Sequence, residues 1–141
     1  MLVRLMYASR ATAPLKPETL NAILKKSTTN NPAVGVTGVL CFSGDIFLQV
    51  LEGGRSAVSA LYNRIAQDPR HHDVALLSYE EIGERSFSHW SMGQVNMSRL
   101  NPALVLKYSE GTQLDPYAVS GQASLALFNE LVATASIGVQ V

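Results

Sequence analysis

Residues 34–51, VGVTGVLCFSGDIFLQVL, decide the fold of this chain. They contain two runs rich in β-branched and aromatic residues, 34–42 and 46–51, separated by the turn sequence Ser43-Gly44-Asp45. Two such runs joined by a short turn predict a β-hairpin. The segments on both sides of this hairpin complete the predicted architecture.

On both sides of the hairpin, the hydrophobic spacing alternates between strand-like and helical. The predicted elements are a strand at 2–8, a helix from Pro17 to about 28–31, the two hairpin strands, a helix at 55–67, a strand at 74–79 and a fifth, edge strand at 90–95. The first helix should end there because Asn31 precedes Pro32. The order β-α-β-β-α-β with an added edge strand predicts a ferredoxin-like α+β sandwich with two helices on one face.

Two further helices are predicted after this unit, at 102–108 and 116–135. The second carries a wide apolar stripe that includes Leu125, Phe128 and Val132. We therefore expect residues 1–96 to form one domain. Residues 97–141 would form a C-terminal helical extension that covers the bare face of the sheet or a subunit interface.

The composition excludes several classes of function. Eleven Lys and Arg balance eleven Asp and Glu, which argues against nucleic-acid and membrane-surface binding. One cysteine, Cys41, excludes a disulfide framework and a multi-cysteine metal site. No apolar run is long enough for a membrane span, and the N-terminus does not resemble a signal peptide, so a cytoplasmic protein is expected.

Gln49 is the least expected residue of the hairpin. It shares one face of its strand with Phe47 and Leu51, and both faces are apolar, so its amide needs a hydrogen-bonding partner. Tyr7 lies on the first strand, which neighbours the third in this fold, so the two side chains can face each other. The pair is either structural or a redox-active phenol beside a hydrogen-bond switch, and spacing alone does not decide.

Other polar residues have ordinary explanations as well as functional ones. Asn30 and Asn31 suit a helix end, but also the polar edge of a flat heterocycle. Arg64 can hold a phosphate or pair with Asp68 at i+4. Trp90 and Met92, two residues apart on the predicted edge strand, share a face and form either simple packing or a movable lid.

No catalytic constellation stands out. Adjacent His71 and His72 lack further metal ligands at suitable spacing, so no metal site is expected. One alternative function is a ferredoxin-like hydrolase, with Arg10 in the first loop as the anion binder. Another is an RNA-recognition fold with Tyr7 and Phe47 as stacking platforms, which the zero net charge disfavours.

The same residues carry a resemblance to a known family. The chain resembles the BLUF domains, blue-light sensors that use FAD, and among them the short members of the PixD type. The resemblance rests on four blocks in order: Leu5-Met6-Tyr7-Ala8-Ser9, then Asn31-Pro32-Ala33-Val34-Gly35-Val36-Thr37-Gly38, then Phe47-Leu48-Gln49-Val50-Leu51-Glu52-Gly53, and Trp90-Ser91-Met92. Together with 64–72 they cover most of residues 2–95.

This resemblance implies roles for individual residues. Tyr7 would be the photoactive tyrosine and Gln49 the switching glutamine, and Trp90 and Met92 would shift with the signalling state. The FAD-binding set would be Tyr7, Ile23, Ser27, Asn30, Asn31, Phe47, Gln49, Arg64, Ile65 and Asp68. Electron and proton transfer from Tyr7, followed by rearrangement of the Gln49 hydrogen bonds, would give a reversible red-shifted state.

The resemblance also implies a receptor without enzymatic activity. It would form a homo-oligomer, either a dimer or a larger ring-like assembly. Its signal would pass to a separate protein such as a response regulator or a cyclic-dinucleotide enzyme.

Overall fold

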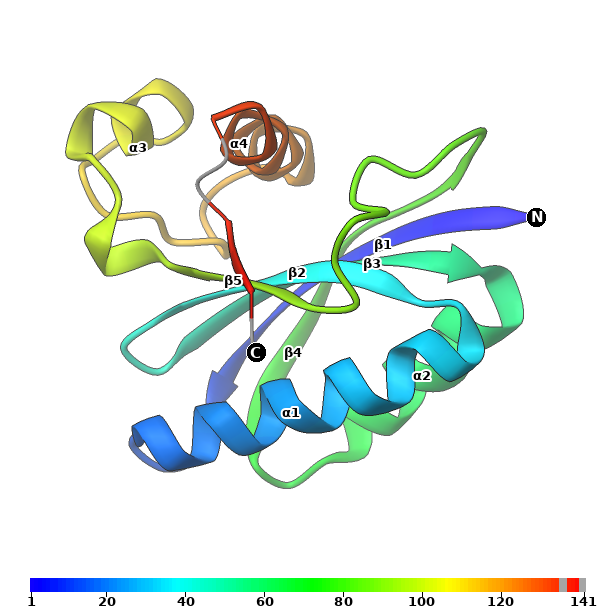
Figure 1. Cartoon of the computed structure of the whole chain (residues 1–141). Helices are drawn as coiled ribbons and strands as arrows, with labels where there is room; N and C mark the ends of the chain where they lie inside the picture. Colours follow the sequence, from blue (N-terminus) through cyan, green and yellow to red (C-terminus); the bar gives the residue numbers. More distant parts are fainter. Residues whose placement is uncertain (135–136, 140–141) are drawn as a thin grey trace.

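The computed structural model of the chain describes residues 1–134 and 137–139, which form one mixed sheet with helices on both faces (Figure 1). The strands are β1 (Leu2–Ala11), β2 (Thr37–Ser43), β3 (Ile46–Gly54), β4 (His71–Ile82), β5 (Gly93–Asn96) and β6 (Gly138–Val139). The helices are α1 (Pro17–Val34), α2 (Arg55–Gln67), α3 (Pro102–Tyr108) and α4 (Gly121–Ala133), with a short 3-10 turn η1 (Met97–Arg99). The strand order is β4-β1-β3-β2-β5-β6. The predicted ferredoxin-like α+β fold is confirmed.

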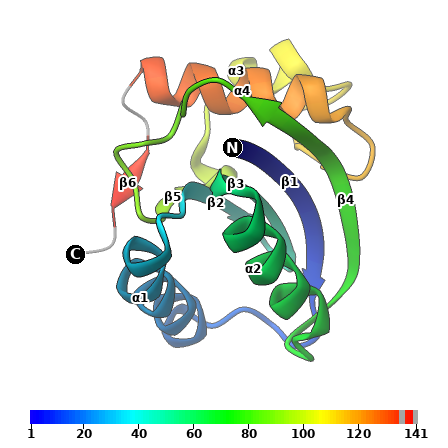
Figure 2. The ribbon, with the colours of Figure 1, turned by 90° about the vertical axis from the view of Figure 1, so that its right-hand side faces the viewer.

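The sheet separates two hydrophobic cores. Helices α1 and α2 lie on one side of the sheet, and α3 and α4 lie on the other (Figures 1 and 2). The core beneath α1 and α2 contains Tyr7, Leu24, Phe47, Leu51 and Met92, among others. The core beneath α3 and α4 contains Met6, Leu48, Val50, Phe87, Leu127, Phe128 and Leu131, among others. Both faces of the sheet are therefore covered, which explains why its central strands are apolar on both sides.

The hairpin forms as predicted. β2 and β3 pair antiparallel from Thr37 opposite Glu52 to Ser43 opposite Ile46. The turn between them places Gly44 at φ 57°, a conformation that glycine adopts without a steric penalty. The expected alternation also holds, because Gln49 faces the α1 and α2 side.

The first helix is longer than predicted. α1 continues through Pro32 and ends at Gly35, which adopts a left-handed conformation at φ 71°. The amide of Val36 donates to the carbonyl of Asn31, which closes the end of the helix. Proline weakens the helical preference of the preceding residue, but a glycine three positions later supplies the better terminus.

The fifth strand is shorter than predicted and is not the edge. It spans Gly93–Asn96, pairs parallel with β2 and pairs on its other side with β6. Trp90 and Met92 therefore lie in the irregular segment before the strand, and the prediction that they share one face is wrong. Without the strand pleat, these two side chains point into different cores.

The end of β1 and the start of α4 also differ from the predicted positions by several residues. β1 extends to Ala11, so Arg10 lies in a strand rather than in the predicted loop. α4 begins at Gly121 rather than at residue 116, since Ser120 caps it, and the predicted helix end at residue 135 lies outside the described residues. The C-terminal helices pack on the sheet through Phe128 and its neighbours, while a domain boundary near residue 96 stays a prediction.

Candidate functional site

A cavity of about 660 Å³ lies between α1 and α2, with β1 and β3 at its base. Its lining includes all ten residues that the family resemblance assigned to cofactor binding. They are Tyr7, Ile23, Ser27, Asn30, Asn31, Phe47, Gln49, Arg64, Ile65 and Asp68. The fold thus brings together residues that are up to sixty positions apart in the sequence, although what they bind stays a prediction.

Tyr7 and Gln49 form the polar centre of the cavity. They are directly opposite each other in the β1–β3 register, and the Tyr7 hydroxyl donates a hydrogen bond to Gln49 Oε1. The Gln49 Nε2 donates to the sulfur of Met92 at 3.2 Å. Gln49 is only 5% exposed, so these two contacts fix the direction of a buried amide. The predicted contact between Tyr7 and Gln49 is present.

Burial also determines the protonation state of Tyr7. Desolvation raises the pKa of the phenol well above its ordinary value, and the nearby Tyr62 and Asp68 raise it further. The rings of Tyr7 and Tyr62 lie 5.7 Å apart between centroids. Tyr7 is therefore a neutral hydrogen-bond donor at any physiological pH.

Asn31 lies near the C-terminal end of α1 and is 4% exposed. Its Nδ2 donates to the carbonyl of Ser91 at 2.9 Å. One turn earlier, the Ser27 hydroxyl donates to the carbonyl of Ile23 within the same helix. Asn31 thus joins the cavity wall to the segment that carries Met92.

The predicted pairing of Arg64 with Asp68 is wrong. Asp68 pairs instead with Arg70, whose Nη2 lies 2.6 Å from Asp68 Oδ2. The hydrogen bonds from Arg70 lower the pKa of Asp68 to about 2. Asp68 directly follows α2, and the chain turns back at Pro69. This turn brings the Arg70 side chain to the Asp68 carboxylate. Arg64 still lines the cavity and makes no ion pair with any residue that the structure describes.

Trp90 and Met92 lie on opposite sides of the sheet. Met92 is 1% exposed and belongs to the core beneath α1 and α2, next to Gln49. Trp90 is half-buried and packs on the other core, with its ring 5.8 Å from that of His89. Met92, and not Trp90, is therefore the residue that contacts the buried amide.

Lys26, Arg70 and His71 also line the cavity, but the sequence analysis did not assign them to it. His71 Nδ1 lies 2.9 Å from Ser9 Oγ and Nε2 lies 2.5 Å from the carbonyl of Ile65. Lys26 lies three residues after Ile23 in the predicted helix and therefore on the same helical face, so helical spacing could have identified it as a lining residue. Arg70 reaches the cavity at the turn that follows α2, where it pairs with Asp68, and His71 reaches it through the pairing of β4 with β1, which no local pattern reports.

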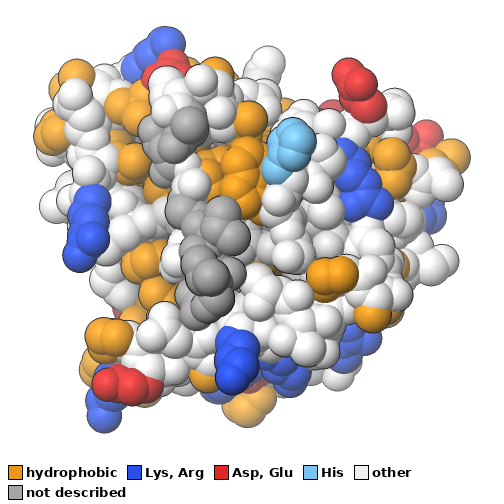
Figure 3. Space-filling view, viewed as in Figure 1, with side chains coloured by type: hydrophobic (Ala, Val, Ile, Leu, Met, Phe, Trp, Pro, Cys, Tyr) orange, Lys and Arg blue, Asp and Glu red, His pale blue; other side chains and the backbone are white. Residues whose placement is uncertain are grey.

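The structure disfavours both alternative functions. Arg10 lies in β1, where its guanidinium stacks on Tyr117 at 4.6 Å from the ring centroid, and it does not line the cavity. Tyr7 and Phe47 are 4% and 7% exposed, so they are not stacking platforms for RNA. Lys and Arg side chains and Asp and Glu side chains both appear on the face shown in Figure 3.

No helix in 1–134 is long and apolar enough to cross a membrane. Within residues 1–134 and 137–139, no group of three or more His, Cys, Asp and Glu side chains is arranged to hold a metal ion.

Comparison with known families decides the family to which the chain belongs. The family model BLUF, described as sensors of blue light using FAD, matches residues 2–93. The chain belongs to the BLUF family. This match covers the whole cavity and ends at the start of β5.

Individual BLUF relatives support this family assignment. Photoactivated adenylate cyclase subunit beta of Euglena gracilis is 40% identical over 92 residues, which is 64% of this chain and 11% of the relative. The chain thus spans about a tenth of the length of such curated relatives. Among solved structures, BlsA in its photo-activated state has 31% identity and a TM-score of 0.81, covering 94% of this chain and 95% of that one. BlrB, a BLUF protein in its dark state, has 32% identity and a TM-score of 0.80, covering 95% and 96%.

The cavity fits the flavin that BLUF domains use. Its volume lies within the roughly 300–1,000 Å³ of small-molecule sites. Ile23 and Ile65 supply apolar walls, while Asn31 and Gln49 supply amides that suit the polar edge of a ring system. Lys26 and Arg64 supply positive charge, which suits phosphate groups.

Proposed function

We propose that this BLUF chain is a blue-light photoreceptor that binds FAD non-covalently in the cavity between α1 and α2. The observation that carries the proposal is the hydrogen-bonded series from Tyr7 through Gln49 to Met92, on the floor of a cavity of suitable size. The family membership supports the same conclusion.

In this proposal, Ile23, Ser27, Asn30 and Asn31 hold one side of the flavin from α1. Ile65, Arg64 and Asp68 hold the other side from α2. Phe47, Tyr7 and Gln49 form the base. The charged side chains Lys26 and Arg64 bind the phosphate end, where FAD and a shorter flavin differ.

When bound, the flavin absorbs blue light and becomes a strong oxidant. Tyr7 is the electron donor in our proposal. Because its phenol is neutral and bonded to Gln49 Oε1, transfer of an electron to the bound flavin would make the hydroxyl proton acidic, and the proton would follow along that hydrogen bond to the flavin. The Gln49 amide then rotates or tautomerises, exchanging its bonds with Tyr7 and Met92 for a new set. Electron and proton would both return to Tyr7 as the Gln49 amide rearranges, so that no net oxidation remains. The altered hydrogen bonding shifts absorption to the red and reverts in the dark.

We further propose that the receptor itself is not an enzyme and that its signal passes to another protein. The support is that the chain covers 95% of BlsA, described in a photo-activated state, and 96% of BlrB, described as a BLUF protein in its dark state. The partner would be a response regulator or a cyclic-dinucleotide enzyme, and the receptor would form a dimer or larger ring-like assembly. Light scattering after size-exclusion chromatography, in darkness and under blue light, tests the assembly. An unchanged monomer in both conditions would contradict it. A cytoplasmic location stays a prediction.

Absorption spectroscopy of the purified protein tests the central proposal. We expect a yellow preparation whose flavin bands shift to the red under blue light and return in darkness. Heat release of the pigment, followed by mass spectrometry, should identify FAD. A colourless protein that does not retain added FAD would contradict the proposal and reopen the alternative functions.

A further inference from the structure

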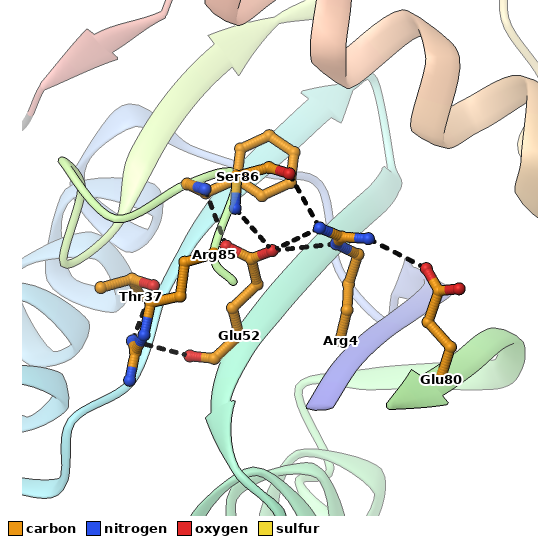
Figure 4. Close-up of polar contacts among 7 residues, drawn as sticks. Arg4, Thr37, Glu52, Glu80, Arg85 and Ser86 are labelled. Atoms are coloured by element: carbon orange, nitrogen blue, oxygen red, sulfur yellow. Dashed lines mark hydrogen bonds and ion pairs between the residues drawn. The ribbon is translucent and has the colours of Figure 1, made fainter. Parts of the chain in front are cut away.

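A row of polar and charged side chains crosses the sheet on the face opposite the cavity (Figure 4). Cross-strand pairing places Glu80 of β4, Arg4 of β1, Glu52 of β3 and Thr37 of β2 side by side. Arg4 donates to Glu52 at 2.9 Å and to Glu80 at 2.9 Å. Neither the cavity nor the proposed photochemistry uses this row.

Glu52 is the centre of the row and is fully buried. Besides Arg4, its carboxylate accepts the backbone amides of Ser86 at 3.1 Å and Phe87 at 2.7 Å. Charge-assisted bonds of this kind are about twice as strong as neutral ones. Glu52 therefore attaches the connection between β4 and β5 to the middle of the sheet.

Arg85 makes a second attachment one residue earlier. Its guanidinium donates to Thr37 Oγ1 at 3.0 Å, to the Glu52 carbonyl at 3.3 Å and to the Gly35 carbonyl at 2.7 Å. Gly35 is the residue that ends α1, the helix that carries Asn31. We call Glu52 and Arg85, with the residues that they hold, the Glu52–Arg85 clamp.

The other end of the segment 85–92 reaches the cavity. The Trp90 carbonyl accepts from the Gly38 amide at 2.9 Å, the Ser91 carbonyl accepts from Asn31, and the Met92 sulfur accepts from Gln49. Segment 85–92 is thus held by the clamp at its start and contacts two cavity amides, those of Asn31 and Gln49, at its end. Only four residues lie between Phe87 and Met92, so the clamp limits where Met92 can lie.

A buried ion pair contributes little net stability, because desolvating the two charges cancels most of their attraction. Apolar residues would fill this site about as well. What the carboxylate adds is direction, since two consecutive amides point at its oxygens and fix the path of the chain. This favours a role in positioning over a role in stability.

We propose that Glu52 and Arg85 are positioning residues of the light response: they hold segment 85–92 so that Ser91 and Met92 present their acceptors to Asn31 and Gln49. Return to the dark state requires these acceptors to be in place again. With the clamp lost, the segment samples more positions, and the dark contacts re-form less often. The inference rests on the proposed photoreceptor function.

Dark recovery of the flavin-loaded protein tests the clamp. Glu52→Gln keeps the side-chain shape but removes the charge, and Arg85→Met removes three hydrogen bonds from a less buried position. Both variants should bind flavin and shift normally, but recover at least roughly threefold more slowly than the unaltered protein. If Glu52→Gln does not fold, Arg85→Met alone tests the clamp.

Two controls separate positioning from general loss of stability. Arg55→Met removes an ion pair with Glu81 that does not involve segment 85–92. Ser120→Ala removes the cap of α4 and so destabilises the fold elsewhere. Both should recover within about 1.5-fold of the unaltered rate.

The outcomes are distinct. Slow recovery in the clamp variants alone supports the inference. The inference is overturned if the clamp variants recover less than threefold more slowly than the unaltered protein. It is also overturned if the control variants recover as slowly as the clamp variants. A complete absence of any red shift in the unaltered protein would instead overturn the proposed function.

Discussion

Tyr7 is the residue on which the proposed light response depends most directly. Replacing it with Phe keeps the ring and the apolar contacts but removes the hydroxyl that donates to Gln49. We expect Tyr7→Phe to retain flavin and to lose the red shift, as measured by absorption spectra before and after blue light. Tyr62→Phe is the matched control, since its ring neighbours that of Tyr7 without bonding to Gln49, and it should shift normally. A normal shift in Tyr7→Phe would exclude this phenol as the donor.

Asp68 gives a pH-dependent prediction at the same scale. Its pKa falls from 3.8 to about 2 on folding, chiefly through hydrogen bonds from Arg70, so the folded state binds this proton less readily than the unfolded state. Its contribution to stability is present above the unfolded pKa and is lost as the pH falls towards about 2. The difference in free energy of unfolding between the unaltered protein and Asp68→Asn should therefore be larger near pH 6 than near about pH 3.

Urea denaturation across this range measures that difference. Arg70→Met should remove the same pH dependence, because it removes the partner that lowers the pKa. A difference that stays constant with pH would show that Asp68 is not stabilised by this pair.

At the scale of the element, the start of α4 depends on one side chain. Ser120 Oγ accepts from the amide of Ala123 at 3.0 Å and satisfies one of the free donors at the helix N-terminus. Ser120→Ala should lower the free energy of unfolding by about 1 kcal/mol, whereas Ser120→Asp keeps an acceptor and should cost little. Chemical denaturation monitored by circular dichroism measures both. Equal stability of the two variants would argue against the cap.

Irregular segments position the site as much as helices and strands do. Segment 85–92 has no regular structure, yet it supplies the acceptors for both Asn31 and Gln49. Its path is set by two backbone amides that donate to the Glu52 carboxylate of β3 and by the Arg85 side chain, which donates to the Thr37 hydroxyl of β2. Periodicity carries no information about such a segment, which is why Trp90 and Met92 were predicted to share a face.

At the scale of the whole molecule, Phe128 joins the C-terminal helices to the rest of the fold. It is 1% exposed on α4, and its ring meets that of Phe87 edge-on at 5.9 Å between centroids. Phe128→Ala should therefore lower the free energy of unfolding by about 3–5 kcal/mol. Leu106→Ala, on the exposed side of α3, should change it by less than about 0.5 kcal/mol.

Thermal or chemical unfolding of both variants measures these effects. If residues 97–134 were an independent extension, Phe128→Ala would leave the unfolding of the remainder unchanged. A single transition that shifts as a unit would instead show that the helices and sheet unfold together.

The sequence by itself determined the order of helices and strands, the hairpin, and ten of the residues that line the cavity. It did so because hydrophobic spacing reports the local backbone, and because the motifs around Tyr7, Asn31 and Gln49 resemble those of one family. It also indicated that Gln49 needs a partner, since an unpaired amide on an apolar strand is costly.

Only the tertiary structure decided the placement of Trp90 and Met92 in opposite cores and the convergence of Arg4 and Glu52 on the segment that begins at Arg85. Each depends on strand register and on the path of an irregular connection. Those follow from the packing of the whole chain, where contacts between distant residues outweigh the preferences of neighbours.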